Sequence, residues 1–552
     1  MDKRDVGIKI MALVVAMVMV LSMGITAFAA KDTTHEITIA SDATQKENHS
    51  YKAYQVFVGT YDTTSKQLQN FDWGTGVDSA ALLTELKTTD TSSPYYGCDT
   101  AAKVAAVLNG KADDSAEAKA FAEAVSKHLA TGVDSTGNKD DGYKITVTGD
   151  GYYFIKDTTA SLVKGDTYSS YMLQVIGDLE VKAKDSTTTS QKKVKDTDDT
   201  AGSTTDWQDS ADYDIGDKVP FQLKGTVADD YDKYTTYVFN FHDKEGTGLT
   251  FNNDAKVYVD GTEITTGFEV VTEDLEDRCT FEVRFVNLKQ IASVKAGSVI
   301  TVEYTSTLNE NAVIGQKGNP NTSHIEFSNN PNGDQSGTGR TPDDTVIVFT
   351  YKSTVTKVDE NSEPLSGADF ELYKQVPAGT TGAKTGSDIK ANWDDAVKNA
   401  ATALDNSTSY VVVSTKAATG NIFEFTGIDD GTYVLVEKTV PTGYNAWTAT
   451  QFVVTATHNT SAEIDPATGK VDGGTEYILT GLTGDPLFGN GKLGTITLNE
   501  TKADLDVTIT NQSGSTLPET GGIGTTIFYI VGAILVVGAG IVLVTRRRMS
   551  AN

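Results

Sequence analysis

Apolar and polar residues alternate along most of this chain, with the two-residue period of half-buried β-strands. Good examples are residues 35–39 and 51–57, followed later by residues 143–148, 151–157 and 171–175. Three stretches depart from this period and predict helices, at residues 79–87, 100–109 and 115–130. In the last of these, Phe121 and Val125 belong to one apolar face with Ala118, Ala122 and Leu129. The pattern predicts a mostly β protein whose N-terminal part also contains helices.

Turn residues recur about every ten positions between residues 185 and 349, which is typical of a β-sandwich. A polar run at residues 185–190 marks a boundary before this region. The length of 552 residues allows three domains of ordinary size. We therefore expect domains at residues 30–183, 184–349 and 350–512.

The first 29 residues have the composition of a secretory signal peptide. Lys3, Arg4 and Lys9 precede an apolar run, and Ala27-Phe28-Ala29 fits the small-x-small cleavage rule. We expect the mature chain to start near Ala30, which predicts a secreted protein.

Residues 513–552 combine three features in a fixed order. The pentapeptide Leu517-Pro518-Glu519-Thr520-Gly521 comes first, an apolar run from Ile523 to Val544 follows, and Arg546 begins a cluster of three arginines. About 20 apolar residues suffice for a helix to cross the ~30 Å hydrocarbon core, and the arginines favour the cytoplasmic side. Pro518 keeps the pentapeptide extended and accessible.

This order resembles the cell-wall sorting signal of Gram-positive surface proteins, which sortase reads. The resemblance implies cleavage between Thr520 and Gly521 and transfer of the Thr520 carbonyl to an amine. The C-terminal helix would then hold the chain in the membrane only transiently. The alternative is an ordinary membrane anchor that happens to contain the pentapeptide.

Composition narrows the classes of partner. Asp and Glu outnumber Lys and Arg by 75 to 46, giving a net charge of -29 that argues against nucleic acid as a partner. Only two cysteines, Cys98 and Cys279, are present, and they fall in different predicted domains. A disulfide is not indicated, so an extracellular chain of this length needs another source of stability.

The predicted domains resemble those of Gram-positive backbone pilins. Residues 51–57 and 70–74 are similar to the N-terminal pilin domain, whereas residues 184–349 resemble a collagen-adhesin A-type domain and residues 350–512 a collagen-adhesin B-type domain. The resemblance implies tandem Ig-like β-sandwich domains in a rod. Inserts near residues 391–403 and 465–491 interrupt the pattern of the last domain.

The resemblance also implies an internal Lys–Asn isopeptide bond in each of the last two domains. In the second domain it assigns Lys192 as nucleophile, Asn329 as acceptor and Asp243 as the promoting acid. Burial lowers a lysine pKa, so the neutral amine can attack an amide that the fold holds against it, while a carboxyl group moves the protons. Lys192 shares a strand face with Val194, but a one-residue register error would exchange it for Lys193.

In the third domain the resemblance assigns a bond between Lys357, on the first strand, and Asn511, on the last. Glu437 is the corresponding acid. A further lysine is expected to accept the sortase-bound Thr520 of the neighbouring subunit. By position this is Lys184, with Lys182 as the rival, because residues 181–184 lack the Tyr and Pro of the usual pilin motif.

We therefore expect a structural backbone subunit of a covalent, cell-wall-anchored pilus that supports adhesion. The implied partners are a pilus-specific and a housekeeping sortase, identical subunits, peptidoglycan, minor pilins and a host surface ligand. The alternatives are a monomeric wall-anchored adhesin and a minor pilin. An enzyme is not indicated, because the sequence has no Gly-rich phosphate loop or metal-ligand cluster and its six histidines are scattered. No cofactor or metal is expected, and His242 beside Asp243 is interpreted as an outward-facing strand residue.

Overall fold

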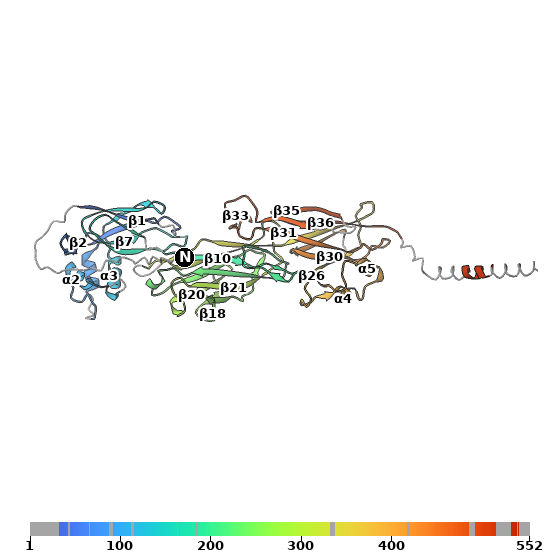
Figure 1. Cartoon of the computed structure of the whole chain (residues 1–552), viewed down its shortest axis with the longest axis horizontal. Helices are drawn as coiled ribbons and strands as arrows, with labels where there is room; N and C mark the ends of the chain where they lie inside the picture. Colours follow the sequence, from blue (N-terminus) through green and yellow to red (C-terminus); the bar gives the residue numbers. More distant parts are fainter. Residues whose placement is uncertain are drawn as a thin grey trace, which may run out of the picture.

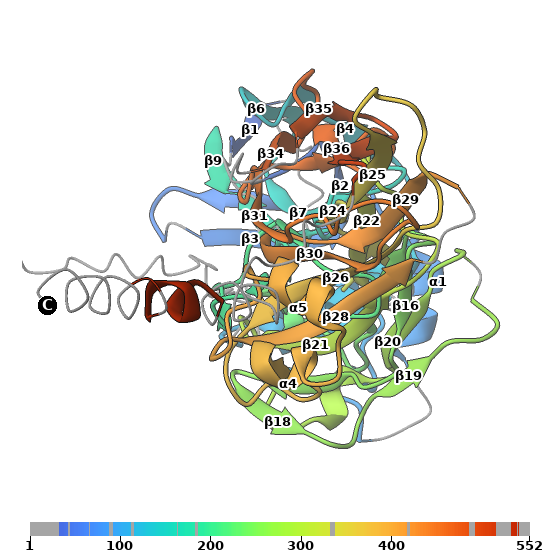
Figure 2. The same ribbon diagram turned by 90° about the vertical axis from the view of Figure 1, so that its right-hand side faces the viewer.

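The structure is a computed structural model that describes residues 33–41, 45–65, 67–87, 92–111, 115–162, 164–182, 186–275, 277–331, 337–416, 420–484, 492–514, 531–537 and 539. Their strands form three successive pairs of main sheets, which we call the first, second and third units. The units follow one another along the long axis of the molecule (Figure 1), and they overlap in projection when seen along that axis (Figure 2). The predicted mostly β, rod-like architecture is confirmed.

The first unit packs two sheets against each other and adds three helices. One sheet has the order β5-β6-β1-β9 and the other β3-β2-β7-β8, with β4 also paired to β2. The strands are β1 (Thr34–Ala40), β2 (Tyr51–Asp62), β3 (Gln67–Trp73), β4 (Gly132–Asp134), β5 (Thr136–Asn138), β6 (Gly142–Thr148), β7 (Gly151–Asp157), β8 (Ser170–Val175) and β9 (Leu179–Lys182).

The three predicted helices are confirmed as α1 (Ser79–Leu86), α2 (Ala101–Leu108) and α3 (Ala116–Lys127). At the start of each helix, a side-chain oxygen accepts hydrogen bonds from backbone N–H groups of the first turn. The accepting residues are Asp78, Thr100 and Ser115, respectively. Phe121 of α3 is buried and stacks on Phe57 of β2, with ring centroids 5.5 Å apart. The helices thus cover one side of the hydrophobic core of the first unit.

The second unit is a β-sandwich. One sheet runs β10-β14-β21-β17-β18, with β16 beside β21, and the other runs β13-β24-β22-β15-β20-β19, with β23 beside β22. The elements are β10 (Thr189–Val194), β11 (Thr197–Asp198), β12 (Ser203–Thr204), β13 (Ser210–Asp212), β14 (Lys218–Thr226), η1 (Tyr231–Lys233), β15 (Phe239–Glu245), β16 (Leu249–Phe251), β17 (Lys256–Val259), β18 (Thr262–Ile264), β19 (Glu269–Val271), β20 (Phe281–Phe285), η2 (Leu288–Gln290), β21 (Val299–Leu308), β22 (Asn319–Ser328), β23 (Thr338–Arg340) and β24 (Asp344–Phe349).

The third unit is also a sandwich, with sheets β29-β25-β36-β35 and β27-β28-β26-β30-β31-β34. Two short helices lie within the predicted insert region. The elements are β25 (Tyr351–Asp359), β26 (Asp369–Val376), β27 (Lys384–Thr385), α4 (Gly386–Lys390), α5 (Asp395–Ala400), β28 (Ser409–Lys416), β29 (Ile422–Ile428), β30 (Gly431–Thr439), β31 (Thr450–His458), β32 (Ile464–Asp465), β33 (Lys470–Val471), β34 (Leu479–Gly484), β35 (Lys492–Asn499) and β36 (Lys502–Asn511).

Strand β24 contributes to two cores. Val346 and Val348 pack in the core of the second unit, whereas Ile347 and Phe349 pack in the core of the third. This division follows from the alternation of side chains across a strand. Only Thr350 separates β24 from β25, the first strand of the third unit. The second and third units are therefore joined through packed apolar side chains as well as through the chain.

The contact between the first and second units is made by a loop. The backbone N–H of Gly165 donates to the carbonyl of Arg340 at 3.1 Å, and that of Tyr168 donates to the carbonyl of Asn329 at 2.8 Å. Here the loop before β8 meets the end of β22 and strand β23.

Several predicted features lie outside the described residues: the signal peptide, Lys184, the pentapeptide Leu517–Gly521 and most of the run from Ile523 to Val544. Within that run residues 531–537 are helical. No helix among the residues that the structure describes is both long and apolar enough to cross a bilayer. Cys98 and Cys279 are both free thiols, so neither forms a disulfide.

The shared strand leads to a prediction. Phe349→Ala should lower the free energy of unfolding by about 3–5 kcal/mol, because it empties a ring-sized space in the core of the third unit. Scanning calorimetry measures the change. Val412→Ala, which truncates a side chain that is 55% exposed, serves as the control and should leave the transition nearly unchanged. An equal effect of both substitutions would contradict the shared-core interpretation.

Candidate functional site

The core of the second unit contains a buried lysine. Lys192 of β10 has no exposed surface, and its ammonium group contacts the carboxylate of Asp243 on β15. Its Nζ also donates to the hydroxyl of Tyr304 at 2.8 Å, and that hydroxyl donates to Asp243 Oδ2 at 2.7 Å. Because β10 and β15 belong to opposite sheets, the lysine and the acid meet across the centre of the sandwich.

Strand alternation decides which lysine is buried. Lys192 and Val194 point into the core, whereas Lys193 points outward and forms an ion pair with Asp209. On β15 the same alternation turns Asp243 inward and His242 outward. Lys192 is therefore the lysine that can take part in buried chemistry.

Asn321 of β22 completes the cluster in the second unit. It is fully buried, and its side-chain amide donates to the Tyr304 hydroxyl at 2.9 Å. Its Oδ1 is buried without a hydrogen-bond partner. Thus Lys192, Asp243, Tyr304 and Asn321 form one connected group of polar side chains inside an apolar core.

The predicted acceptor Asn329 does not lie in this cluster. Phe239 pairs with Phe327 and Asp243 with Ser323, so Asn329 lies six residues beyond the level of Asp243, about 20 Å away along the strand direction. It sits instead at the junction with the first unit, where its carbonyl accepts the Tyr168 N–H at 2.8 Å. The expectation that Asn329 lies beside Lys192 is wrong, and the asparagine of this cluster is Asn321, on the inward face of β22.

Burial changes the protonation of this cluster. Desolvation lowers the pKa of Lys192 and raises the pKa of Asp243, in each case against the attraction of the opposite charge. Both shifts favour the neutral pair, in which the lysine is an amine and the aspartate a carboxylic acid. These are the states that nucleophilic attack with acid assistance requires.

The third unit contains a comparable cluster in a different arrangement. Lys357 lies on β25 and Asn511 on the parallel neighbour β36, while Glu437 comes from β30 of the opposite sheet. The Lys357 Nζ donates to the Asn511 side-chain carbonyl and lies 3.4 Å from Glu437 Oε1. The Asn511 amide donates to Glu437 Oε1 at 2.9 Å and to Oε2 at 3.1 Å. All three side chains are buried.

Burial and hydrogen bonding also set the protonation and the position of the side chains in this cluster. Burial is the largest cause that lowers the pKa of Lys357, to about 8, while Glu437 opposes the shift. Glu437 is held in place by the backbone N–H of Trp447, which donates to Oε2 at 2.8 Å. The structure thus brings together Lys357, Asn511 and Glu437, the three residues assigned to this domain from the sequence.

A third buried lysine, Lys374, shows the opposite behaviour. Its ammonium group contacts Asp199 Oδ2 at 2.9 Å, Asp214 Oδ2 at 2.8 Å and the carboxylate of Asp429. Although burial lowers its pKa, the surrounding carboxylates raise it more, so the net shift is upward. Lys374 remains a cation that binds the second unit to the third. Sequence reasoning missed it, because Asp199 and Asp214 lie in another unit.

Of the two candidate acceptor lysines, only Lys182 is among the residues with described positions. It ends β9 with its side chain exposed. The pentapeptide and Lys184 fall in the segments for which no structure is described.

Comparison with known proteins matches three segments of the chain to family models. Residues 215–331 match the Gram-positive pilin backbone subunit 2, Cna-B-like domain, residues 352–470 match a prealbumin-like fold domain, and residues 509–550 match the LPXTG cell wall anchor motif. The chain thus contains a Gram-positive pilin backbone domain and an LPXTG cell wall anchor. It is a structural pilus subunit that is anchored to the cell wall at the bacterial surface.

Two relatives support this assignment. The pilin is 28% identical over 420 residues to the trypsin-resistant surface T6 protein of Streptococcus pyogenes serotype M6, covering 66% of this chain and 70% of that protein. The solved structure of the T6 backbone pilin, which has three domains, aligns with a TM-score of 0.51 at 17% identity. That alignment covers 88% of this chain and 100% of the other, and it establishes a common fold.

Removal of the Lys374 charge gives a test of the ion cluster. Lys374→Met should lower the free energy of unfolding at pH 7 by about 3–5 kcal/mol, because it leaves buried carboxylates unpaired. The folded-state pKa values of Asp214 and Asp429 are raised, so protonation on acidification relieves this penalty. The deficit should therefore be smaller at pH 5 than at pH 8 in denaturant titrations.

Lys256→Met is the matched control, because Lys256 is exposed on β17. It should change stability little at either pH. A Lys374→Met deficit that is small, or that does not shrink on acidification, would show that the ammonium group does not hold these carboxylates.

Proposed function

We propose that this pilin is the repeating subunit of a covalent shaft in which two internal Lys–Asn bonds reinforce each subunit. The observation that carries the proposal is the buried contact among Lys357, Asn511 and Glu437. A charged lysine has no reason to be buried against an uncharged amide unless the pair serves a further purpose.

The chemistry in the third unit follows from the hydrogen bonds. The neutral Lys357 amine attacks the side-chain carbonyl carbon of Asn511, forming a C–N bond. Glu437 takes the proton released from the amine and delivers it to Nδ2 of Asn511, which it already holds at 2.9 Å. The bond from the carbonyl carbon to Nδ2 then breaks, and ammonia leaves. Because the fold already holds the reacting groups together, the reaction avoids the entropy loss of a bimolecular encounter.

In the second unit we propose the equivalent bond between Lys192 and Asn321, with Asp243 as the acid. The Tyr304 hydroxyl contacts Lys192 and Asn321 and donates to Asp243, so it can pass protons among the three. This bond joins opposite sheets, whereas the bond from Lys357 to Asn511 joins neighbouring strands.

Each bond would stabilise the fold by restricting the unfolded chain. Lys357 and Asn511 are 154 residues apart, for which loop-closure entropy gives about 5 kcal/mol. Such bonds resist reduction. They would give an extracellular chain with two free thiols the ruggedness that other secreted proteins obtain from disulfides.

Polymerisation is proposed to use the sorting signal. A pilus-specific sortase exchanges the peptide bond between Thr520 and Gly521 for a thioester, and the amine of Lys184 on the next subunit displaces the thiol. A housekeeping sortase passes the last subunit to peptidoglycan. Minor pilins and a host surface ligand are the further partners in this proposal. The match to the cell wall anchor motif at residues 509–550 supports it.

Intact mass tests the internal bonds. The measured mass of the purified wild-type chain should be lower than the mass calculated from its sequence by that of two ammonia molecules. Glu437→Ala and Asn321→Ala should each restore one, because each removes an acid or an acceptor. Peptide mapping should find Lys192 joined to Asn321 and Lys357 joined to Asn511.

Asn329→Ala is the matched control for Asn321→Ala. Both asparagines are buried, Asn321 near the start of β22 and Asn329 directly after its end. It should retain both bonds. Loss of the second-unit bond in Asn329→Ala with retention in Asn321→Ala would reverse the correction made above, and a full-mass wild type would refute both bonds.

An immunoblot of cell-wall extracts boiled in detergent tests polymerisation. Wild type should give a high-mass ladder that collapses to monomer in Lys184→Ala and persists in Lys182→Ala. A ladder that is lost only in Lys182→Ala would move the acceptor to Lys182. The absence of a ladder in wild type would instead favour a monomeric wall-anchored adhesin or a minor pilin.

A further inference from the structure

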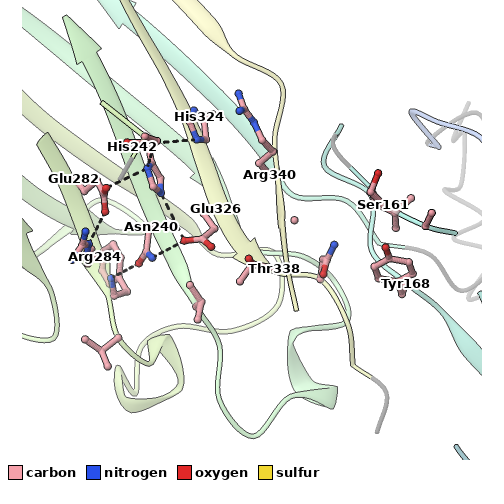
Figure 3. Close-up of a pocket in the computed structure, with 18 residues that line it drawn as sticks. Ser161, Tyr168, Asn240, His242, Glu282, Arg284, His324, Glu326, Thr338 and Arg340 are labelled. Carbon is pink, nitrogen blue, oxygen red and sulfur yellow. Dashed lines mark hydrogen bonds and ion pairs between the residues drawn. The ribbon is translucent and has the colours of Figure 1, made fainter. Parts of the chain in front are cut away.

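A row of metal-ligating side chains lies on the outer face of one sheet in the second unit. His242 of β15 pairs directly with His324 of β22 on one side and with Glu282 of β20 on the other. The two imidazole rings stack with centroids 4.7 Å apart (Figure 3). Because Asp243 turns inward to Lys192, its neighbour His242 must turn outward into this row.

The segment preceding β20 places two more ligand groups against the row. Asp277 Oδ2 lies 2.7 Å from His242 Nδ1, 2.9 Å from Cys279 Sγ and 4.0 Å from His324 Nε2. Cys279 Sγ lies 3.8 Å from His242 Nδ1. The ligand atoms of His242, Asp277 and Cys279 therefore all lie within 4.8 Å of one another, with His324 stacked beside them.

The second nitrogen of each imidazole faces a carboxylate. His242 Nε2 is 3.8 Å from Glu326 Oε2, and His324 Nδ1 is 3.3 Å from Asp343 Oδ1. Outer carboxylates of this kind fix the tautomer and orientation of metal-binding histidines and increase their basicity. An ordinary ion pair needs only one carboxylate, whereas His242 meets Asp277 at Nδ1 and Glu326 at Nε2, so the double arrangement points to a ligand between His242 and Asp277.

We propose that His242, Asp277 and Cys279 form a binding site for a borderline transition-metal cation, with Zn²⁺ as the best match. Imidazole and thiolate together select this class over Ca²⁺ or Mg²⁺, which prefer oxygen ligands. On binding, the Cys279 thiol releases its proton to solvent and His242 offers the lone pair of Nδ1. Three protein ligands leave the fourth position of a tetrahedron to water.

The spacing of the ligand atoms suits this cation. Metal bonds of about 2.0–2.3 Å in a tetrahedron separate ligand atoms by roughly 3.3–3.8 Å. The contacts of 2.7 and 2.9 Å to Asp277, which are now hydrogen bonds, need to lengthen by less than about 1 Å. The strands hold both histidines, so this adjustment falls on the segment containing Asp277 and Cys279.

The site lies on the wall of a cleft of about 780 Å³ between the second unit and the first. Ser161 and Tyr168 of the first unit line the opposite wall (Figure 3). A bound cation would connect β15 to the segment before β20, and so stiffen the second unit where it faces the first.

Metal titration of the full-length pilin, purified in detergent, reduced and freed of metal by a chelator, tests the proposal. With Zn²⁺ alone we expect one ion per chain, in competition with a chromogenic chelator, and a higher melting temperature in its presence. Cys279→Ser and His242→Gln should each weaken binding at least about tenfold. Co²⁺ should give a thiolate-to-metal charge-transfer band that Cys279→Ser removes.

Cys98→Ser is the matched control, because it removes the other thiol from a different unit. It should leave the stoichiometry, the affinity and the Co²⁺ spectrum unchanged. The proposal is overturned if wild type binds no Zn²⁺ or if Cys279→Ser binds as tightly as wild type. It is equally overturned if only Cys279→Ser loses binding while His242→Gln binds normally, since that identifies adventitious binding to a thiol.

Discussion

The cost of placing a lysine in an apolar core is the constraint on which the rest of this structure depends. A buried ammonium must be paired with carboxylates or give up its proton. Three lysines among the described residues are buried, and they meet this constraint in two ways. Lys374 stays charged among three carboxylates and serves as a joint between units. Lys357 faces Glu437 and Asn511, whereas Lys192 faces Asp243 and Tyr304, and burial lowers the pKa of both lysines toward the neutral amine.

The second and third units depend on each other more than either depends on the first. They share the side chains of β24 between their cores, and Lys374 of the third unit is held by Asp199 and Asp214 of the second. The contact between the first and second units includes two backbone hydrogen bonds beside a cleft. Stiffness is therefore distributed unevenly along the rod.

Much of this could be predicted from local patterns in the sequence. The two-residue period put Lys192 on the face of Val194 but left Lys193 as an alternative, which the burial of Lys192 decides. The apolar face around Phe121 identified α3. Strand pairing was not predictable to the same degree, because register depends on contacts between distant segments. The family resemblance points to Asn329 near a strand end, whereas the inward face of β22 carries Asn321, the acceptor that we propose. For the same reason the histidines looked scattered in sequence, although His242 and His324 are direct neighbours across two strands.

The position of Lys192 at the start of the second unit has a mechanical consequence if the proposed linkages form. Tension that enters at Lys184 passes within a few residues to Lys192, crosses to Asn321, follows the chain through β24 and β25 to Lys357, and crosses to Asn511 just before the sorting signal. Most strands of both sandwiches are bypassed. The first unit lies entirely on the N-terminal side of Lys184. It is therefore a side branch of the fibre, outside the path of the tension. This explains why none of the lysines described in that unit is buried, since a domain that is never pulled needs no covalent brace.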